Sequence, residues 1–228
     1  MHFFVNNDYK IIFGWSGKCG CSHVKKIYYF FCNNIEKELH TDDEYEQELP
    51  ENIEDYTSIL FIRNPYKRLV SGFLDKYSKN GIYSDKFLAK YNIIKFNTFV
   101  DELINGDWSI IDEHHFTPQT TEQFNKSKII KSKSLILYDI ESINYKYLEK
   151  LFNKKIPDTL LNFKGGHERK VYNIDFDDDS VYNLDINKYI KYNVHVNNFY
   201  NKELKEKVYK FYNNDFLFFK EFSFDYEK

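Results

Sequence analysis

The stretch that decides the fold is FGWSGKCGCSHVKK, residues 13–26. It continues a short apolar run, Tyr9 to Phe13, whose β-branched and aromatic residues predict a buried strand. Its tail predicts a helix from about His23 to Asn33, capped by Ser22, because apolar residues recur there at spacings of three and four. A strand, a glycine-rich turn and a helix in succession are typical of a loop that binds an anion.

The residues of this loop narrow the choice of anion. Gly17 and Gly20 permit close approach of the backbone to a ligand, and Lys18 adds a full positive charge. A nucleoside triphosphate loop of the Walker type needs a serine or threonine after its Gly-Lys pair, and here Cys19 follows. The sequence therefore indicates a phosphate-like ligand other than ATP or GTP. A tight strand–helix connection with a solvent-facing lysine is the alternative interpretation.

Composition indicates an ordinary globular protein. The chain has 228 residues, of which 42% are hydrophobic and 29% charged, and we expect one domain over residues 1–228. The net charge of -3 gives no general attraction to nucleic acid. We see neither a run of ~20 apolar residues, as a membrane span needs, nor the pattern of a secretory signal. Three cysteines, an odd number, favour a reducing compartment, so we expect a soluble cytoplasmic protein.

The remaining elements alternate between strands and helices. Two further apolar runs predict strands, Thr57 to Ile62 and Ser134 to Tyr138. Helices are predicted after Asn64-Pro65, around Tyr145 to Phe152 and from Lys202 to Tyr212, with polar segments over Glu36 to Asp55 and Asp175 to Asp185. This alternation predicts an α/β fold, a P-loop-like single domain with a central parallel sheet flanked by helices.

A second anion site is predicted where the second strand ends. Arg63 follows that strand directly, and open α/β sheets bind ligands at the carboxyl ends of their strands. Its guanidinium suits two parallel hydrogen bonds to a phosphate. Asn64 as N-cap and Pro65 in the first helical position open the next helix, on which Ser71 can add a hydroxyl donor. Two anion sites indicate a ligand with phosphates at two separate positions.

Other candidate sites have simpler explanations. Cys19, Cys21, His23 and Cys32 lie close in sequence, but Cys-x-Cys is not the usual zinc spacing, so we expect no metal. The basic stretch 126–133 is more typical of a solvated face than of a glycan site. The loop at Gly165-Gly166, with His167, Arg169 and Lys170, is a candidate for closing over a ligand, whereas 177–179 lacks the ligand spacing of a calcium loop.

Four segments, in order along the chain, resemble one enzyme family. GKCGCSHVKK (17–26) resembles the PK-x-GC-[ST]-N-W-K-R loop of carbohydrate sulfotransferases of the chondroitin 4-O-sulfotransferase type. FIRNPYKRLVSGFLDKY (61–77) resembles their R-[DEN]-P-[FY]-x-R-L-V-S segment, and DEHHFTPQ (112–119) their H-[WF]-x-P-Q segment. Residues 199–226 resemble their closing helix and aromatic tail.

The resemblance implies a donor, 3′-phosphoadenosine 5′-phosphosulfate (PAPS), and a role for each matching residue. The loop from Gly17 would hold the 5′-phosphosulfate, with Lys18 at the bridging oxygen. The other donors implied in this loop are Gly20, Cys21, Ser22 and His23. Arg63 and Ser71 would bind the 3′-phosphate. Two departures stand out: Gly17 replaces the proline of the family pattern, and His23-Val24 replaces Asn-Trp.

The resemblance also implies a reaction, the in-line transfer of a sulfuryl group to an acceptor hydroxyl, expected to belong to a carbohydrate. A base must take the hydroxyl proton, and His115 aligns with the histidine of the family. His114 and Glu113 are the alternatives, and an extended segment would turn the two histidines opposite ways. His115 as a buried structural histidine is a further interpretation. Lys18 would stabilise the leaving phosphate, without a metal. A P-loop kinase and an inactive anion-binding or glycan-binding module remain rival hypotheses.

Overall fold

A computed structural model describes six segments of the chain and places them in two compact units. The described residues are 1–32, 47–78, 82–120, 126–161, 172–175 and 180–226. Unit 1 comprises Met1–Arg63 and Gln119–Gly166, and unit 2 comprises Asn64–Pro118 and His167–Lys228. Each unit is described separately below, and the prediction of a single domain over 1–228 stays a prediction.

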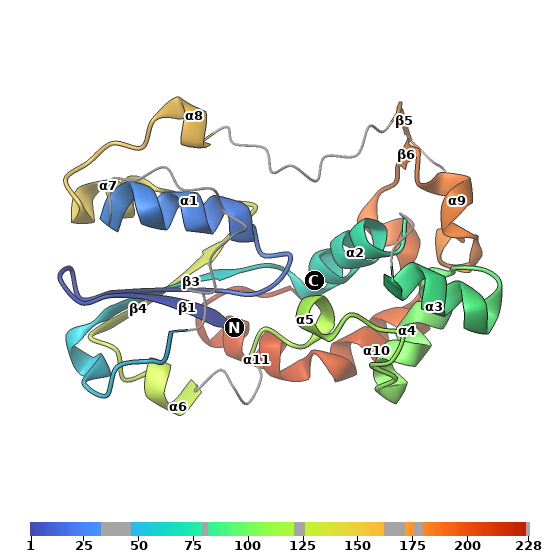
Figure 1. The fold of residues 1–228 in the computed structure, drawn as a ribbon, viewed down its shortest axis with the longest axis horizontal. Helices are drawn as coiled ribbons and strands as arrows, with labels where there is room; N and C mark the ends of the chain where they lie inside the picture. Colours follow the sequence, from blue (N-terminus) through green and yellow to red (C-terminus); the bar gives the residue numbers. More distant parts are fainter. Residues whose placement is uncertain (33–46, 79–81, 121–125, 162–171, 176–179, 227–228) are drawn as a thin grey trace. The chain divides into compact units, whose positions relative to one another are not determined.

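Unit 1 is built on a four-stranded sheet (Figure 1). Its strands are β1 (His2–Asn6), β2 (Ile11–Trp15), β3 (Thr57–Ile62) and β4 (Ser134–Asp139), paired in that order. β2, β3 and β4 run parallel, with Phe13 opposite Ile59 and Ile59 opposite Ile136. β1 runs antiparallel to β2. The carboxyl ends of the three parallel strands therefore lie at one edge of the sheet.

Helices cover both faces of this sheet within unit 1. The helices of the unit are α1 (Cys21–Cys32), α6 (Lys126–Ile129), α7 (Lys146–Leu151) and α8 (Asp158–Leu161), with a 3-10 turn η1 at Ile53–Asp55. One hydrophobic cluster joins Phe13 and Phe61 of the sheet to Ile27 of α1, Leu148 of α7 and Leu160 of α8. Figure 1 shows α6 on the opposite side of the sheet from α1.

The predicted α/β fold with a central, mostly parallel sheet is confirmed in unit 1. β3 has the predicted bounds, β4 extends one residue further than predicted, and β2 is shifted two residues toward Trp15. β1 is an addition to the prediction, which placed no strand before Tyr9. The predicted cap of the first helix is wrong: α1 begins at Cys21, so Ser22 is its second residue.

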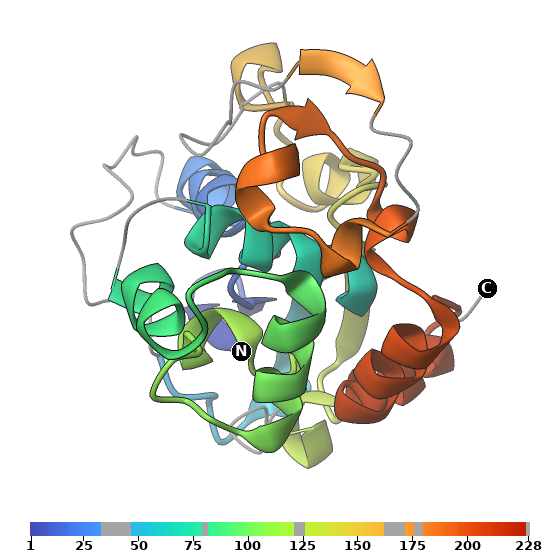
Figure 2. The same ribbon diagram turned by 90° about the vertical axis from the view of Figure 1, so that its right-hand side faces the viewer.

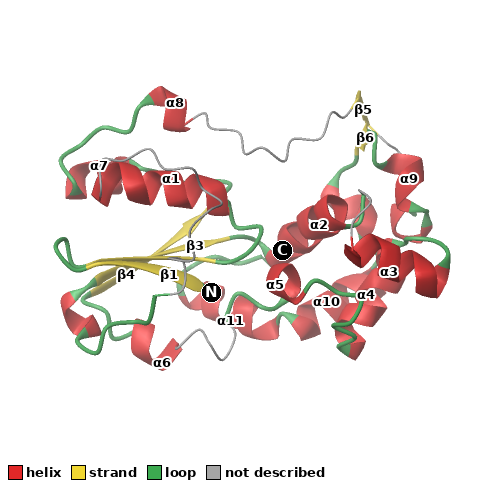
Figure 3. Ribbon diagram, viewed as in Figure 1, coloured by secondary structure: helices red, strands yellow, loops and turns green. Residues whose placement is uncertain are grey.

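Unit 2 is mainly helical, as Figure 3 shows by its colouring. Its elements in chain order are α2 (Pro65–Lys76), α3 (Ile82–Tyr91), α4 (Phe96–Asn105), α5 (Glu113–Phe116), β5 (Tyr172–Asp175), η2 (Val181–Asn183), α9 (Ile186–Tyr189), β6 (Tyr192–Asn193), η3 (Val196–Phe199), α10 (Lys202–Phe211) and α11 (Asn213–Glu221). β5 and β6 form a separate parallel pair. Figure 2 gives the clearest view of these helices.

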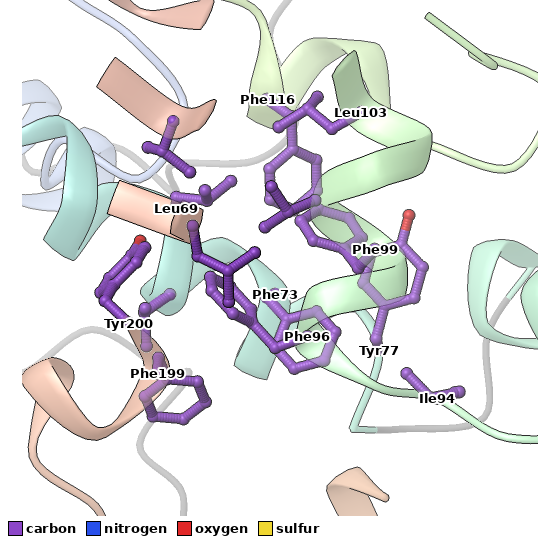
Figure 4. Close-up of a cluster of buried hydrophobic side chains, with 14 of the residues drawn as sticks. Leu69, Phe73, Tyr77, Ile94, Phe96, Phe99, Leu103, Phe116, Phe199 and Tyr200 are labelled. Atoms are coloured by element: carbon purple, nitrogen blue, oxygen red, sulfur yellow. The ribbon is translucent and has the colours of Figure 1, made fainter. Parts of the chain in front are cut away.

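An aromatic core fills unit 2. Phe73 and Tyr77 of α2 contact Phe99 of α4, with ring centroids about 5 Å apart, and Phe99 in turn contacts Phe116 of α5 at 4.9 Å. Figure 4 shows these rings together with Phe96 and the other labelled residues of the cluster. Each of these five aromatic residues is at most 1% exposed. The core therefore holds α5 against α2 and α4.

In unit 2 the predicted helix starts at Asn64 and Lys202 are confirmed, and the local conformation considered for the two histidines is not. Asn64 caps α2 by accepting hydrogen bonds from the N–H groups of Tyr66 and Lys67, as predicted. The predicted last helix is α10, and the aromatic tail after it contains a further helix, α11. Residues 113–116 form a short helix, not the extended segment expected. The Gly165-Gly166 loop and residues 177–179 lie outside the described residues.

Candidate active site

The glycine-rich loop of unit 1 is a tight turn between β2 and α1. The Cys19 N–H donates to the Ser16 carbonyl at 3.1 Å, which places Gly17 and Lys18 in the middle of a four-residue turn. Lys18 has a positive φ of 65° at the third position, where turns of this kind favour glycine. Gly17 occupies the second position, where proline is common and where the resembling family pattern has its proline. A lysine held in this strained conformation indicates a functional constraint on the loop.

The end of the turn requires glycine and leaves polar groups for a ligand. Gly20 has a φ of 70°, which side chains disfavour, and its carbonyl accepts the Val24 N–H of the first α1 turn. The first N–H groups of a helix have no partner within the helix. Ser16, which the sequence prediction did not include, is 5% exposed, and its hydroxyl has no hydrogen-bond partner in the described part of the chain. A buried hydroxyl beside a helix start is consistent with an anion site.

Arg63 lies in the same unit as this loop and contacts it. Its Nη1 donates to the Lys18 carbonyl at 3.3 Å, and its Nε pairs with the Glu141 carboxylate at 3.2 Å. The Arg63 side chain is 20% exposed, and its Nη2 makes no hydrogen bond to any described residue. Unit 1 therefore brings the two predicted cations, Lys18 and Arg63, to the carboxyl edge of its sheet.

Gln119 ties the turn to Arg63, and the sequence analysis assigned it no role. Its side chain is fully buried and spans the Arg63 backbone: Oε1 accepts from the Arg63 N–H at 3.1 Å, and Nε2 donates to the Arg63 carbonyl at 2.9 Å. The Cys19 thiol donates to the same Oε1 at 3.0 Å. Gln119 thus acts as a one-residue strand partner for the end of β3 and holds the loop at Cys19.

We expect Gln119→Met to destabilise the fold. Methionine has a similar volume but leaves the part-buried Arg63 N–H and carbonyl without the Gln119 amide, which should cost about 1–3 kcal/mol. The matched control is Gln47→Met, because exposed Gln47 also accepts a backbone N–H, from Val5, where water can replace it. Urea unfolding of both variants measures the difference. Equal and small losses for the two variants would contradict the role of Gln119.

The start of α1 carries the other predicted loop donors, Cys21, Ser22 and His23, all half-buried. His23 Nε2 is hydrogen-bonded to the Tyr145 hydroxyl, so its ring is already engaged and its backbone N–H is the group left to act as predicted. Burial lowers the pKa of His23, and the positive charge of Lys26 lowers it further. Burial raises the pKa of the Cys21 thiol. All three cysteines of the chain are free thiols.

No metal-binding cluster is found in the part of the chain that the structure describes. There, no three histidine, cysteine or acidic side chains lie close enough together to share an ion. Cys19 and His23, two of the four residues weighed for zinc, are engaged instead with Gln119 and Tyr145.

Unit 2 carries the predicted base. His115 Nδ1 lies 2.8 Å from Asp112 Oδ2, with the two side chains 21% and 11% exposed. The two residues are three positions apart on a helical turn and therefore lie on one face of it. An extended segment would not have brought them together. His114 has its ring centroid 4.7 Å from that of His115, and its pKa is lowered by partial desolvation of the ring and by the nearby His115. Glu113 and His114 are exposed, and His115 is half-buried.

Side chains from other helices hold the backbone of α5. Arg68, which is 2% exposed, donates to the His115 carbonyl at 3.1 Å and to the Thr117 carbonyl at 2.8 Å. The Tyr212 hydroxyl donates to the Phe116 carbonyl at 2.7 Å. Gly72 of α2 is needed here, because a Cβ atom would lie 2.6 Å from the Phe116 ring. The short histidine helix is therefore fixed at successive carbonyls, as a group with a precise task requires. Ser71, half-buried on α2, lies in the same unit.

Comparison with known proteins identifies the family. A family model described as "Sulfotransferase family" matches residues 1–223, nearly the whole chain. The chain belongs to the sulfotransferase family. No curated protein and no solved structure matches the chain significantly.

Membership of the sulfotransferase family confirms sulfuryl transfer as the general class of activity, and with it a transferase that uses a sulfate donor and a hydroxyl-bearing acceptor. Membership does not extend to the chondroitin specificity of the type that the sequence resembles. In the described segments, every helix is too short or too polar to span a membrane.

Proposed function

We propose that this sulfotransferase uses PAPS and transfers its sulfuryl group to a hydroxyl of a carbohydrate acceptor. The observation that carries the proposal is the pairing of Arg63 with the Lys18 turn at the carboxyl edge of the sheet. Two cations held at one edge suit a donor with a phosphosulfate at one end and a separate phosphate. A nucleoside triphosphate loop of the Walker type would instead carry a serine or threonine where Cys19 follows Lys18.

The donor residues of the proposal are those predicted from the sequence. The turn from Gly17 and the start of α1 bind the 5′-phosphosulfate through Lys18 and through donors on Gly20, Cys21, Ser22 and His23. The Ser16 hydroxyl, which has no hydrogen-bond partner among the described residues, is a further candidate donor. Arg63 binds the 3′-phosphate, and Ser71 adds its hydroxyl to that phosphate.

The reaction is an in-line displacement at sulfur. The acceptor oxygen forms a bond to sulfur while the bond from sulfur to the 5′-phosphate oxygen breaks, releasing adenosine 3′,5′-bisphosphate. His115 takes the acceptor proton at Nε2, since Nδ1 faces Asp112. Lys18 stabilises the negative charge that grows on the leaving phosphate. No metal takes part in these steps.

The proposed compartment is the cytoplasm. The three cysteines are free thiols, and Cys19 is committed to a hydrogen bond with Gln119, which needs the reduced sulfur. Burial raises the pKa of Cys32 to about 12, so this thiol stays protonated and unreactive at neutral pH. A reducing compartment fits all three.

Nucleotide protection against heat tests the donor. We expect adenosine 3′,5′-bisphosphate to raise the melting temperature without magnesium, because a ligand that binds only the folded state stabilises it. ATP with magnesium is the comparison, and stronger protection by it would support a P-loop kinase instead. Transfer of sulfur-35 from labelled PAPS to a panel of glycans then tests the activity. Binding of the bisphosphate without transfer to any glycan would indicate an inactive module or a different acceptor class, which a second panel of lipid and phenol acceptors separates.

A further inference from the structure

Asp112 is a buried carboxylate whose position is not explained by the helix that it precedes. It occupies the N-cap position of α5, where aspartate usually accepts a backbone N–H of the first turn. Among the described residues its side chain accepts no such capping bond, and it points instead to His115 Nδ1 at 2.8 Å. An N-cap aspartate without its capping bond stabilises its helix less. The hydrogen bond to His115 replaces that contribution.

The contact fixes which nitrogen of His115 carries the proton. A carboxylate accepts hydrogen bonds and does not donate them, so Nδ1 must be the protonated nitrogen of the neutral ring. Nε2 then carries the lone pair, which is the group that a general base needs. Without the carboxylate, the neutral ring could place its proton on either nitrogen.

The surroundings keep the carboxylate ionised. Burial opposes ionisation of Asp112, but the His115 hydrogen bond and the positive charges of His115, Lys76 and His114 together lower its pKa. Among the described residues, Arg68 of α2 and Tyr77, which caps the end of α2, also face this pair. Asp112 is therefore available as an acceptor for Nδ1–H at neutral pH.

We propose that Asp112 is a positioning residue that sets the tautomer and orientation of His115, so that Nε2 faces the acceptor as the base. The role of His115 as the base rests on the proposed function, whereas the hydrogen bond between Asp112 and His115 is independent of it. Arg68 and Tyr212 hold the α5 backbone through its carbonyls. Asp112 then sets the rotation of the His115 ring and the nitrogen that carries its proton.

Asp112→Asn is the variant that tests this role. An asparagine side chain keeps the shape but can donate to Nδ1, which favours the wrong tautomer. We expect kcat to fall by about 10–100-fold, the usual effect of removing a partner that orients a functional histidine, with KM for PAPS within twofold. Asp112→Glu should recover part of the rate. Asp185→Asn is the matched control, because Asp185 is also an N-cap aspartate of unit 2 but accepts a backbone N–H, from Asn187, instead of contacting a histidine.

Nitrogen NMR of the histidine rings gives a readout that does not need activity. In the wild-type protein the neutral His115 ring should carry its proton on Nδ1. In Asp112→Asn the population of the Nε2–H tautomer should increase. Wild-type His115 in the Nε2–H form would overturn the proposal even if the variant did not fold, as would a kcat unchanged in Asp112→Asn. A wild-type protein that does not transfer sulfur would instead contradict the proposed function, and the NMR result would then decide the positioning role alone.

Discussion

Replacing Arg63 by alanine is expected to weaken binding of adenosine 3′,5′-bisphosphate by about 2–4 kcal/mol, since charged hydrogen bonds in a partly buried site are costly to lose. That corresponds to roughly 30- to 900-fold in Kd. The reason is the geometry of the guanidinium: Nε pairs with Glu141, and Nη1 donates to the Lys18 carbonyl. Nη2, which bonds no described residue, is the group that we propose binds the phosphate. Isothermal calorimetry on the purified protein measures the loss directly.

A comparison of two nucleotides distinguishes loss of a 3′-phosphate contact from a general loss of structure. Adenosine 5′-monophosphate lacks the 3′-phosphate, so its affinity should change much less in Arg63→Ala. Arg63→Lys keeps the charge but not the two parallel hydrogen bonds, and it should recover only part of the affinity. Equal losses for the bisphosphate and the monophosphate would show that Arg63 does not read the 3′-phosphate.

Local sequence signals predicted the elements of the fold where they were strong. β3 could be predicted to the residue, because TSILFI is a continuous apolar run ended by Arg63, and α2 because Asn64-Pro65 is a specific helix start. β1 was missed because its strand character depends on pairing with β2. The chain turns over Asn7 to Lys10, where Lys10 adopts a positive φ of 53°, and that hairpin pairs residues 2–6 with β2.

Some residues of the candidate site could be predicted from local sequence, and others depend on contacts between distant parts of the chain. Lys18 and Arg63 could be predicted because each follows a buried strand, and the ends of parallel strands share an edge of the sheet. Gln119 could not be, since its partners Arg63 and Cys19 are 56 and 100 residues away. Asp112 was within the quoted motif, but its role depends on residues 113–116 being helical. A spacing of three between an aspartate and a histidine is the signal that could have indicated the pair.

Replacing His115 by alanine should lower kcat by about 10²–10⁴-fold, the usual range for a positioned general base. Affinity for the donor should stay within a few-fold of wild type, because the proposal assigns the phosphates to the Lys18 turn and Arg63. Steady-state kinetics with labelled PAPS, together with calorimetry, measures both quantities.

A second substitution at position 115 is needed, because His115→Ala also leaves the buried Asp112 carboxylate without its hydrogen-bond donor. His115→Asn solves this, since the asparagine amide can donate to Asp112 but has no basic nitrogen. It should retain the stability that His115→Ala loses and share its low kcat. His114→Ala, on the same helical turn, is the matched control and should stay within a few-fold of wild type. If His115→Asn turns over normally while His114→Ala or Glu113→Gln does not, the base is one of those two residues and His115 is structural.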